Sequence, residues 1–377
     1  MHRISRRALA ATALALGLVA AHARADNLLV GQVGPFTGFP TPEAWQVRDG
    51  ARAYLDQVNR AGGVRGRRID YFTLDDAFDP ERFLAQFREA VARRPVALLM
   101  PIGSKAVSAL LHSGLLERSD TVVIGAIPGA EVFRQAGHPK LFHLSSGDNA
   151  ELDRILEQCR AQGLMRVHVL AEDLPVGHDW LTAIQAMAAA QGGFTITSEV
   201  LHGDAAAIRR AAQGGVQRAP DSLVLLGTPM FMANALAASR AAGAHEAVFA
   251  LSYLPVPLAV SVAGLAGARG LGIPQAFPNP NGQDTPLQRE FQRAMHQELP
   301  AAHEYTSFHL EGYISARVLV EGLRRLEGTP TPAALAQALH AMGEIDLGGF
   351  RVNFSRGNVA STWTDIGVVG ADGRLKY

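Results

Sequence analysis

The sequence predicts an α/β protein made of two doubly wound lobes. Short apolar runs alternate with amphipathic helical segments, as they do where parallel strands are joined by crossover helices. This cycle restarts after residue 144 with a second series of similar length. Because no low-complexity linker separates the two series, we expect strands to pass directly from one lobe to the other. With 377 residues, the chain is long enough for two domains.

The first series opens with the apolar run Leu28–Val30, which ends in a loop rich in glycine and proline at residues 31–38. A strand that stops in such a loop and leads into a helix normally delivers the loop to the ligand-binding edge of an open sheet. Apolar residues at helical spacing between Val47 and Val58 predict the helix that follows. We expect further strands at 69–74, 96–100, 121–124 and 141–144, and helices beginning at Pro80 and Ala106.

The second series has the same alternation. We expect strands at 167–170, 194–200, 222–226 and 247–251, and helices at 150–162, 180–190, 205–212 and 231–242. The rest of the chain is less regular. It contains a strand-like run at 270–275, helices at 287–298, 305–327 and 332–341, and a tail with strand and turn character.

The composition restricts the possible function classes. Hydrophobic residues make up 48% of the chain and the formal net charge is +0, which argues against intrinsic disorder. The chain also lacks the basic excess that supports nucleic-acid binding, so we expect no nucleic-acid partner. Cys159 is the only cysteine, so no internal disulfide can form, and we interpret it as a buried hydrophobe on a helix.

Residues 1–25 have the pattern of a secretory signal peptide. Their n-region is positively charged, residues 8–21 are apolar, and Ala23-Arg24-Ala25 fits a cleavage site before Asp26. The alternative is an N-terminal membrane anchor, for which this apolar run is short. We therefore expect export with cleavage, and an exported chain of this kind is typical of the bacterial periplasm.

We find no group of residues suited to catalysis. The loop at residues 31–38 is not G-x-G-x-x-G, and Pro35 removes a backbone donor that a pyrophosphate would need. No phosphate-binding P-loop and no G-x-S-x-G motif occurs. Asp75 and Asp76 are neighbours on a predicted strand, so they point to opposite faces and form no acid–base pair. We expect no enzyme, no cofactor and no metal.

Small polar residues instead follow the predicted strands of both lobes. Each such loop alone is compatible with ordinary turn chemistry. Backbone N–H groups and hydroxyls at helix N-termini can also hold an anion or carboxylate without any reaction. Together, the loops on the two lobes predict a binding cleft. The loop residues concerned are Pro35–Gly38, Gly103-Ser104, Pro128–Ala130, Thr228 and Tyr253.

Several longer motifs carry a resemblance to a known family. The most specific are the run Val58–Arg67, which contains Asn-x-x-Gly-Gly-x-x-Gly, and the pair Asp75-Asp76 that follows it. Weaker matches are Gly34–Gly38, Asp49–Arg52, Leu310–Tyr313 and Leu347–Phe350. With these motifs the chain resembles the periplasmic solute-binding proteins of branched-chain amino-acid ABC importers, the leucine/isoleucine/valine-binding type.

The resemblance implies a type I periplasmic binding fold, with two Rossmann-like lobes joined by three hinge crossings near Ser145, Ala276 and Asp346. It also implies a monomer that captures a small solute between the lobes and delivers it to an ABC permease in the inner membrane. A sensory module of the same fold, which passes a ligand signal to a receptor or kinase, is the alternative. The implied lobes are residues 26–145 with 277–346, and residues 146–276 with 347–377.

The expected pocket differs from that of the family's amino-acid binders. They hold the ligand carboxylate with a serine after the third strand, and Ser104, after Gly103, matches it. Their threonine in the next loop is missing from Pro128-Gly129-Ala130, and Val176 replaces a tyrosine. Tyr253 stands where they place an acidic residue for the ligand ammonium.

A buried ammonium without a carboxylate partner is costly, so we expect a small organic acid or amide rather than a free α-amino acid. Its acid group would lie on Ser104 and Gly129, with an aromatic part between Tyr253 and either Trp45 or Phe36. The expected ligand-binding residues are Phe36, Thr37, Trp45, Gly103, Ser104, Pro128, Gly129, Ala130, Asp173, Thr228 and Tyr253.

Overall fold

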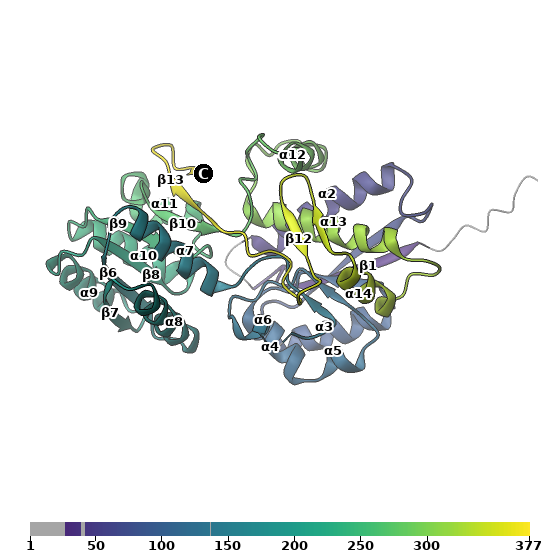
Figure 1. Cartoon of the computed structure of the whole chain (residues 1–377), viewed down its shortest axis with the longest axis horizontal. Coiled ribbons are helices and arrows are strands. Elements are labelled where there is room, and N and C mark those ends of the chain that lie inside the picture. Colours follow the sequence, from purple (N-terminus) through teal and green to yellow (C-terminus); the bar gives the residue numbers. More distant parts are fainter. Residues whose placement is uncertain (1–26, 39–41, 136) are drawn as a thin grey trace, which may run out of the picture.

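A computed structural model of the chain describes residues 27–38, 42–135 and 137–377. It consists of two α/β lobes that lie side by side and are joined by extended segments (Figure 1). The predicted fold class is therefore confirmed. The expected signal peptide, residues 1–25, lies outside the described residues. No helix in the described part of the chain has the length and apolar character needed to cross a membrane.

The first lobe is built on a five-stranded sheet with the order β2-β1-β3-β4-β5 and only parallel pairs. Alternate residues on its short central strands enter two different cores: Leu98 packs with helices α3 and α4, whereas Leu99 packs with α2 and α13. The strands are β1 (Leu28–Gly34), β2 (Ile69–Asp75), β3 (Ala97–Leu99), β4 (Val123–Ile124) and β5 (Leu141–Phe142). The helices are α2 (Glu43–Arg60), α3 (Pro80–Ala92), α4 (Ser104–His112), α5 (Leu115–Arg118), α6 (Val132–Gln135), α12 (Pro286–Glu298), α13 (Ser307–Arg325) and α14 (Pro332–Ala341).

The second lobe has a seven-stranded sheet with the order β14-β13-β10-β9-β8-β6-β7 and one continuous hydrophobic core. The pairs β10–β13 and β13–β14 are antiparallel, and the other pairs of this sheet are parallel. Its strands are β6 (Arg166–Glu172), β7 (Thr195–Leu201), β8 (Ser222–Leu226), β9 (Ala247–Ala250), β10 (Gly272–Gln275), β13 (Asp365–Val369) and β14 (Leu375–Lys376). Its helices are α7 (Asp148–Ala161), α8 (Pro175–Gln191), α9 (Ala205–Gln217), α10 (Pro229–Ala241) and α11 (Val256–Ala268).

The third crossing lies later in the chain than the sequence analysis expected. Strands β11 (Glu344–Asp346) and β12 (Arg351–Asn353) form a hairpin, and Phe350 and Phe354 beside it are buried in the core of the first lobe. The chain joins the second sheet only at β13 (Figure 1). The placement of the crossing near Asp346, with residues 347–377 in the second lobe, was therefore wrong. Phe350, in the hairpin, and Phe354, just after it, have their apolar partners in the first lobe.

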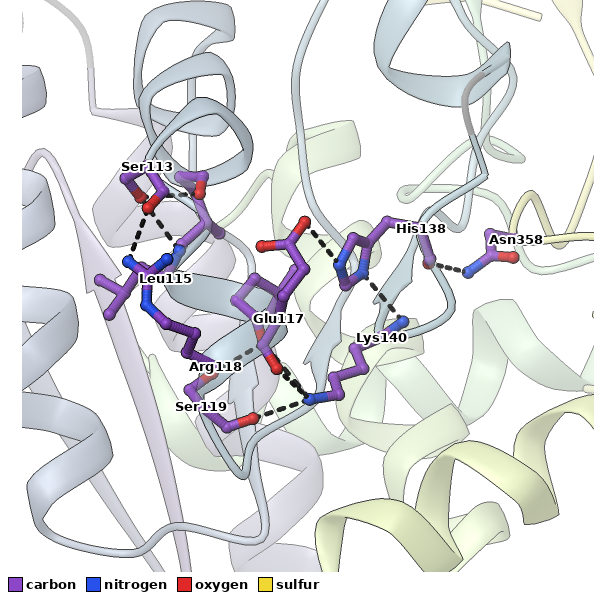
Figure 2. A network of polar contacts seen from close by, with 10 residues as sticks. Ser113, Leu115, Glu117, Arg118, Ser119, His138, Lys140 and Asn358 are labelled. Carbon is purple, nitrogen blue, oxygen red and sulfur yellow. Dashed lines mark hydrogen bonds and ion pairs between the residues drawn. The ribbon is translucent and has the colours of Figure 1, made fainter.

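Hydrogen bonds hold the segment before this crossing on the first lobe. The side-chain amide of Asn358 donates to the carbonyl oxygens of His138 (2.5 Å) and Leu141 (2.8 Å), and the Asn358 carbonyl accepts from His143 N (2.7 Å). In Figure 2, Asn358 lies at one end of a polar network that continues through His138 to Glu117. The segment near residue 358 is thus an added edge of the first lobe.

Helices α2 and α13 approach until their backbones are in contact, and this contact places α13 beside the sheet. A methyl group on Gly50 would lie 1.8 Å from the carbonyl oxygen of His309. In the same way, a methyl group on Gly312 would lie 2.0 Å from the carbonyl oxygen of Val47. Only glycine fits at these two positions, which belong to two of the motifs that carry the family resemblance.

Candidate ligand-binding cleft

A cavity of about 550 Å³ lies between the lobes and is lined by both. The first lobe contributes the loops after β3 and β4 and the start of α13, and the second lobe contributes the loops after β8 and β9. These loops follow the carboxyl ends of parallel strands, where open α/β sheets bind ligands. The volume is that of a typical small-molecule pocket.

Seven of the eleven expected ligand-binding residues line this cavity, and four do not. The four lie in the loop after β1, at the start of α2 and in the loop after β6. The lining residues among those expected are Gly103, Ser104, Pro128, Gly129, Ala130, Thr228 and Tyr253. The others are Phe36, Thr37, Trp45 and Asp173.

The four remaining residues have partners outside the cavity lining. The Trp45 ring meets Phe36 edge-on at a centroid distance of 5.3 Å, and its indole N–H donates to the Phe36 carbonyl oxygen at 2.9 Å. The Thr37 hydroxyl donates to Asp75 at 2.6 Å. Asp173 is exposed and lies 2.8 Å from the Nε2 atom of His178. The aromatic residues that line the cavity are instead Phe78, Trp180, Tyr253, Phe277 and Phe308.

The first-lobe wall is centred on the N-terminus of α4. Gly103 precedes this helix with φ +96°, a conformation that favours glycine, and the Phe78 ring packs beside it. The Ser104 hydroxyl accepts a hydrogen bond from the N–H of Ala130 at 3.2 Å, which ties two of the predicted loops together. The arrangement presents a helix N-terminus and a hydroxyl to the cavity and suits an acid or amide oxygen.

Arg134, which the sequence analysis did not select, brings a guanidinium to the same wall. It comes from α6 and donates to the carbonyl oxygens of Pro128 (2.8 Å), Gly129 (3.3 Å) and Ser145 (3.3 Å). These bonds join the loop after β4 to the first crossing between the lobes. The charge of Arg134 therefore lies at the hinge side of the cavity.

Two buried carboxyl groups of α7 face the cavity from the second lobe. Asp148 accepts hydrogen bonds from the Trp180 indole (2.6 Å) and from the Tyr253 hydroxyl. Glu151 accepts from the backbone N–H (2.9 Å) and the hydroxyl (2.6 Å) of Ser252. Burial raises the pKa of both carboxyls, and the hydrogen bonds partly offset this effect. The polar groups of this wall thus satisfy one another.

Glu311 on α13 is a further buried carboxyl of the lining, which also includes Glu43 on α2, and the surroundings of Glu311 differ from those of the α7 pair. The residue is only 4% exposed, yet its side chain makes no hydrogen bond or ion pair with any residue in the described part of the chain. Burial raises its pKa to about 8, and the charge of Arg134 lowers it to a lesser extent. The sequence could have pointed to Glu311, because this acidic residue interrupts an apolar helical stripe.

No group of three or more histidine, cysteine, aspartate or glutamate side chains suited to a metal ion is found within residues 27–38, 42–135 and 137–377. Asp75 and Asp76 are not among the residues that line the cleft. Asp75 accepts from Thr37 and pairs with Arg82 at 3.0 Å, and Asp76 accepts from the N–H of Phe78. The arrangement is that of a binding site with apolar walls and a few polar groups.

Two α/β lobes around a shared cleft define the class of the protein as a bilobal binding protein. The sequence profile of the periplasmic binding protein family matches residues 28–372. The chain therefore belongs to this family, and the resemblance inferred from the sequence is confirmed. The family consists of substrate-binding proteins rather than enzymes, which agrees with the expectation that the chain is not an enzyme, and membership implies a periplasmic location.

Individual relatives agree with this assignment. An extracellular ligand-binding receptor from Verminephrobacter eiseniae ef01-2 has 40% sequence identity and a TM-score of 0.87, over 93% of this chain and 100% of that one. A substrate-binding periplasmic protein from Ralstonia solanacearum has 27% identity and a TM-score of 0.81, over 93% and 99% of the two chains. A leucine-, isoleucine-, valine-, threonine- and alanine-binding protein from Pseudomonas aeruginosa is 34% identical over 85 residues, and the match spans 22% of each chain.

Proposed function

We propose that the protein is the solute-binding subunit of an ABC importer. It is exported with cleavage of residues 1–25, captures a small solute between its lobes as a monomer, and delivers it to a permease in the inner membrane. The observation that carries this proposal is the cavity of about 550 Å³ lined by loops of both lobes. A ligand that contacts both lobes favours the closed arrangement over the open one, and a permease can recognise that difference.

The ligand we propose is a small solute with an acid or amide group held on the first lobe. Ser104 at the N-terminus of α4 and the backbone of Gly129 suit such a group, and the apolar part would lie between Phe78 and Tyr253. No acidic residue follows β9, but Glu311 supplies an acidic group from α13, so the same cleft can also accommodate an amine on the solute.

Native mass spectrometry of the protein, purified from its host without unfolding, tests the transport proposal. We expect an additional mass of a small solute that is lost when the protein is denatured. The variant S104A should retain less of that solute, because it removes a hydroxyl from the proposed site. Absence of any bound mass, together with no thermal stabilisation by a broad panel of amino acids, organic acids and amides, would contradict the proposal.

A sensory role is the second candidate. The relative from Verminephrobacter eiseniae, at 40% identity, is described as an extracellular ligand-binding receptor, which supports this role. The same cleft would then pass its closed form to a membrane receptor or kinase. Deletion of the gene distinguishes the two, because a transport subunit is needed for uptake of the bound solute, whereas a sensor is needed only for the response to it.

A further inference from the structure

Glu311 has the features of a binding group that lacks its ligand. Glu311 lines the cleft and the residue is 4% exposed, so water cannot fully solvate its carboxyl. It has no hydrogen-bond donor within the described residues. A buried carboxyl without a donor or a cation is costly, and folded proteins generally supply one or the other.

Helix α13 aims this carboxyl at the cleft by its register. Ser307, Glu311 and Ser315 lie four residues apart and therefore share one face of the helix. Ser307 and Glu311 line the cavity, whereas Ser315 is fully buried beside Gly125. The backbone contact at Gly312 holds α13 against α2, so this face has little freedom to turn away.

The two acidic side chains of α7 that line the cleft already accept hydrogen bonds, and the Arg134 guanidinium already donates to backbone carbonyl oxygens. Asp148 and Glu151 accept two hydrogen bonds each from the second lobe. Arg134 donates to three backbone carbonyl oxygens and makes no ion pair with Glu311. Within the described residues no ion pair joins Glu311 to Arg134 or to Lys105, the other cation of the lining, so a ligand can supply the cationic donor.

We propose that Glu311 is the specificity-determining residue for a cationic nitrogen of the bound solute, held on the first lobe near the hinge. The inference rests on the proposed solute-binding function and adds the chemical class of its ligand. The solute is an amphipathic amine: its cationic nitrogen binds the Glu311 carboxylate, and its apolar part contacts side chains such as Phe78, Phe277 and Phe308, which line the same cavity.

Binding of a cation has a characteristic dependence on pH. The empty site favours the protonated carboxyl, and a bound ammonium favours the ionised one, so binding releases a proton. Affinity for an amine should therefore increase by up to about tenfold per pH unit between pH 6 and 8. A ligand that accepts a hydrogen bond from protonated Glu311 should instead bind more weakly as the pH rises.

The charged groups that line the cleft around Glu311 are Glu43 on α2, Lys105 on α4, Arg134 on α6, and Asp148 and Glu151 on α7.

The experiment uses matched sets of compounds on one carbon skeleton. One set is leucine, isoamylamine and 4-methylpentanoate, and the other is phenylalanine, phenethylamine and 3-phenylpropanoate. Thermal shift and calorimetry at pH 6, 7 and 8 measure binding to the wild type, to E311Q, and to E321Q. Glu321 is the matched control, because it lies on the same helix but pairs with Arg324 and Arg325 outside the cleft.

We expect the amine-bearing members of at least one set to bind more tightly than the acid-only member. E311Q should weaken amine binding by about 10- to 100-fold, the range of a lost charge-assisted hydrogen bond, and should flatten the pH dependence. E321Q should bind as the wild type does. Equal binding of amines by wild type and E311Q, or tighter binding of the acid-only members, overturns the inference and leaves the solute-binding function in place. Failure of every compound to bind counts against the inference, and a solute retained in native mass spectrometry would still support the function.

Discussion

The ligand-free protein should become less stable as the pH rises, and Glu311 should account for a measurable part of that loss. Burial raises the pKa of this carboxyl to about 8, compared with 4.5 as its ordinary value. The folded protein therefore binds the proton more tightly than the unfolded chain does. The stability that this group contributes is fully present below about pH 4.5 and is lost as the pH rises toward 8.

The magnitude follows from the size of the pKa difference. Within this window each pH unit costs about 1.4 kcal/mol of the free energy of unfolding for one group. Between pH 5 and pH 7 the loss due to Glu311 is therefore about 3 kcal/mol. Glutamine does not ionise, so E311Q lacks this loss, and the contributions of Asp148 and Glu151 remain common to both proteins.

Urea denaturation of protein stripped of ligand by unfolding and refolding measures the effect. The free energy of unfolding is compared for the wild type and E311Q at pH 5, 6 and 7, with E321Q as the control. We expect the advantage of the wild type over E311Q to decrease by about 3 kcal/mol across this range, and E321Q to follow the wild type. Parallel curves for the wild type and E311Q would refute the argument, because Glu311 would then titrate alike in the folded and unfolded states.

Three further outcomes are expected. G312A should lower the free energy of unfolding, measured by urea denaturation, by about 1–3 kcal/mol, because the added methyl forces α2 and α13 apart. The control is G214A on α9, which should be neutral or stabilising because its methyl would meet only movable side chains. Y253F removes a donor from Asp148 and should cost about 1–3 kcal/mol at pH 8 in the same measurement, with little effect at pH 5. Cys159 should not react with a thiol reagent until the protein unfolds, because it is fully buried and burial raises its pKa; rapid labelling of the native protein would contradict this.

The sequence predicted the parts of the site that local pattern determines. Gly103, Ser104, Gly129, Thr228 and Tyr253 line the cavity, and they could be selected from the sequence because each follows a strand and the carboxyl ends of parallel strands meet at one edge of a sheet. The alternation of apolar strands and amphipathic helices likewise sufficed for the two lobes. Such inferences need only the period of the pattern and the turn residues that end each run.

The parts that the sequence did not predict depend on contacts between distant segments. Glu311 and Arg134 are 177 residues apart in the chain and line the same cavity only because the first lobe folds α13 and α6 to its side of the cleft. The need for glycine at Gly50 and Gly312 arises from a helix contact that no local pattern reveals. Helix α11 was not predicted, because its apolar and small residues have almost no amphipathic pattern.

The two walls of the cleft have different tasks because their polar groups are differently satisfied. On the second lobe, Asp148 and Glu151 bond to groups of their own lobe, and Tyr253 completes this closed set. On the first lobe, the Glu311 carboxyl and the Ser104 hydroxyl proton have no partner within the described residues. A solute therefore gains more polar contacts on the first lobe than on the second. Binding should begin there, and the second lobe should close over the solute mainly through shape and apolar contact.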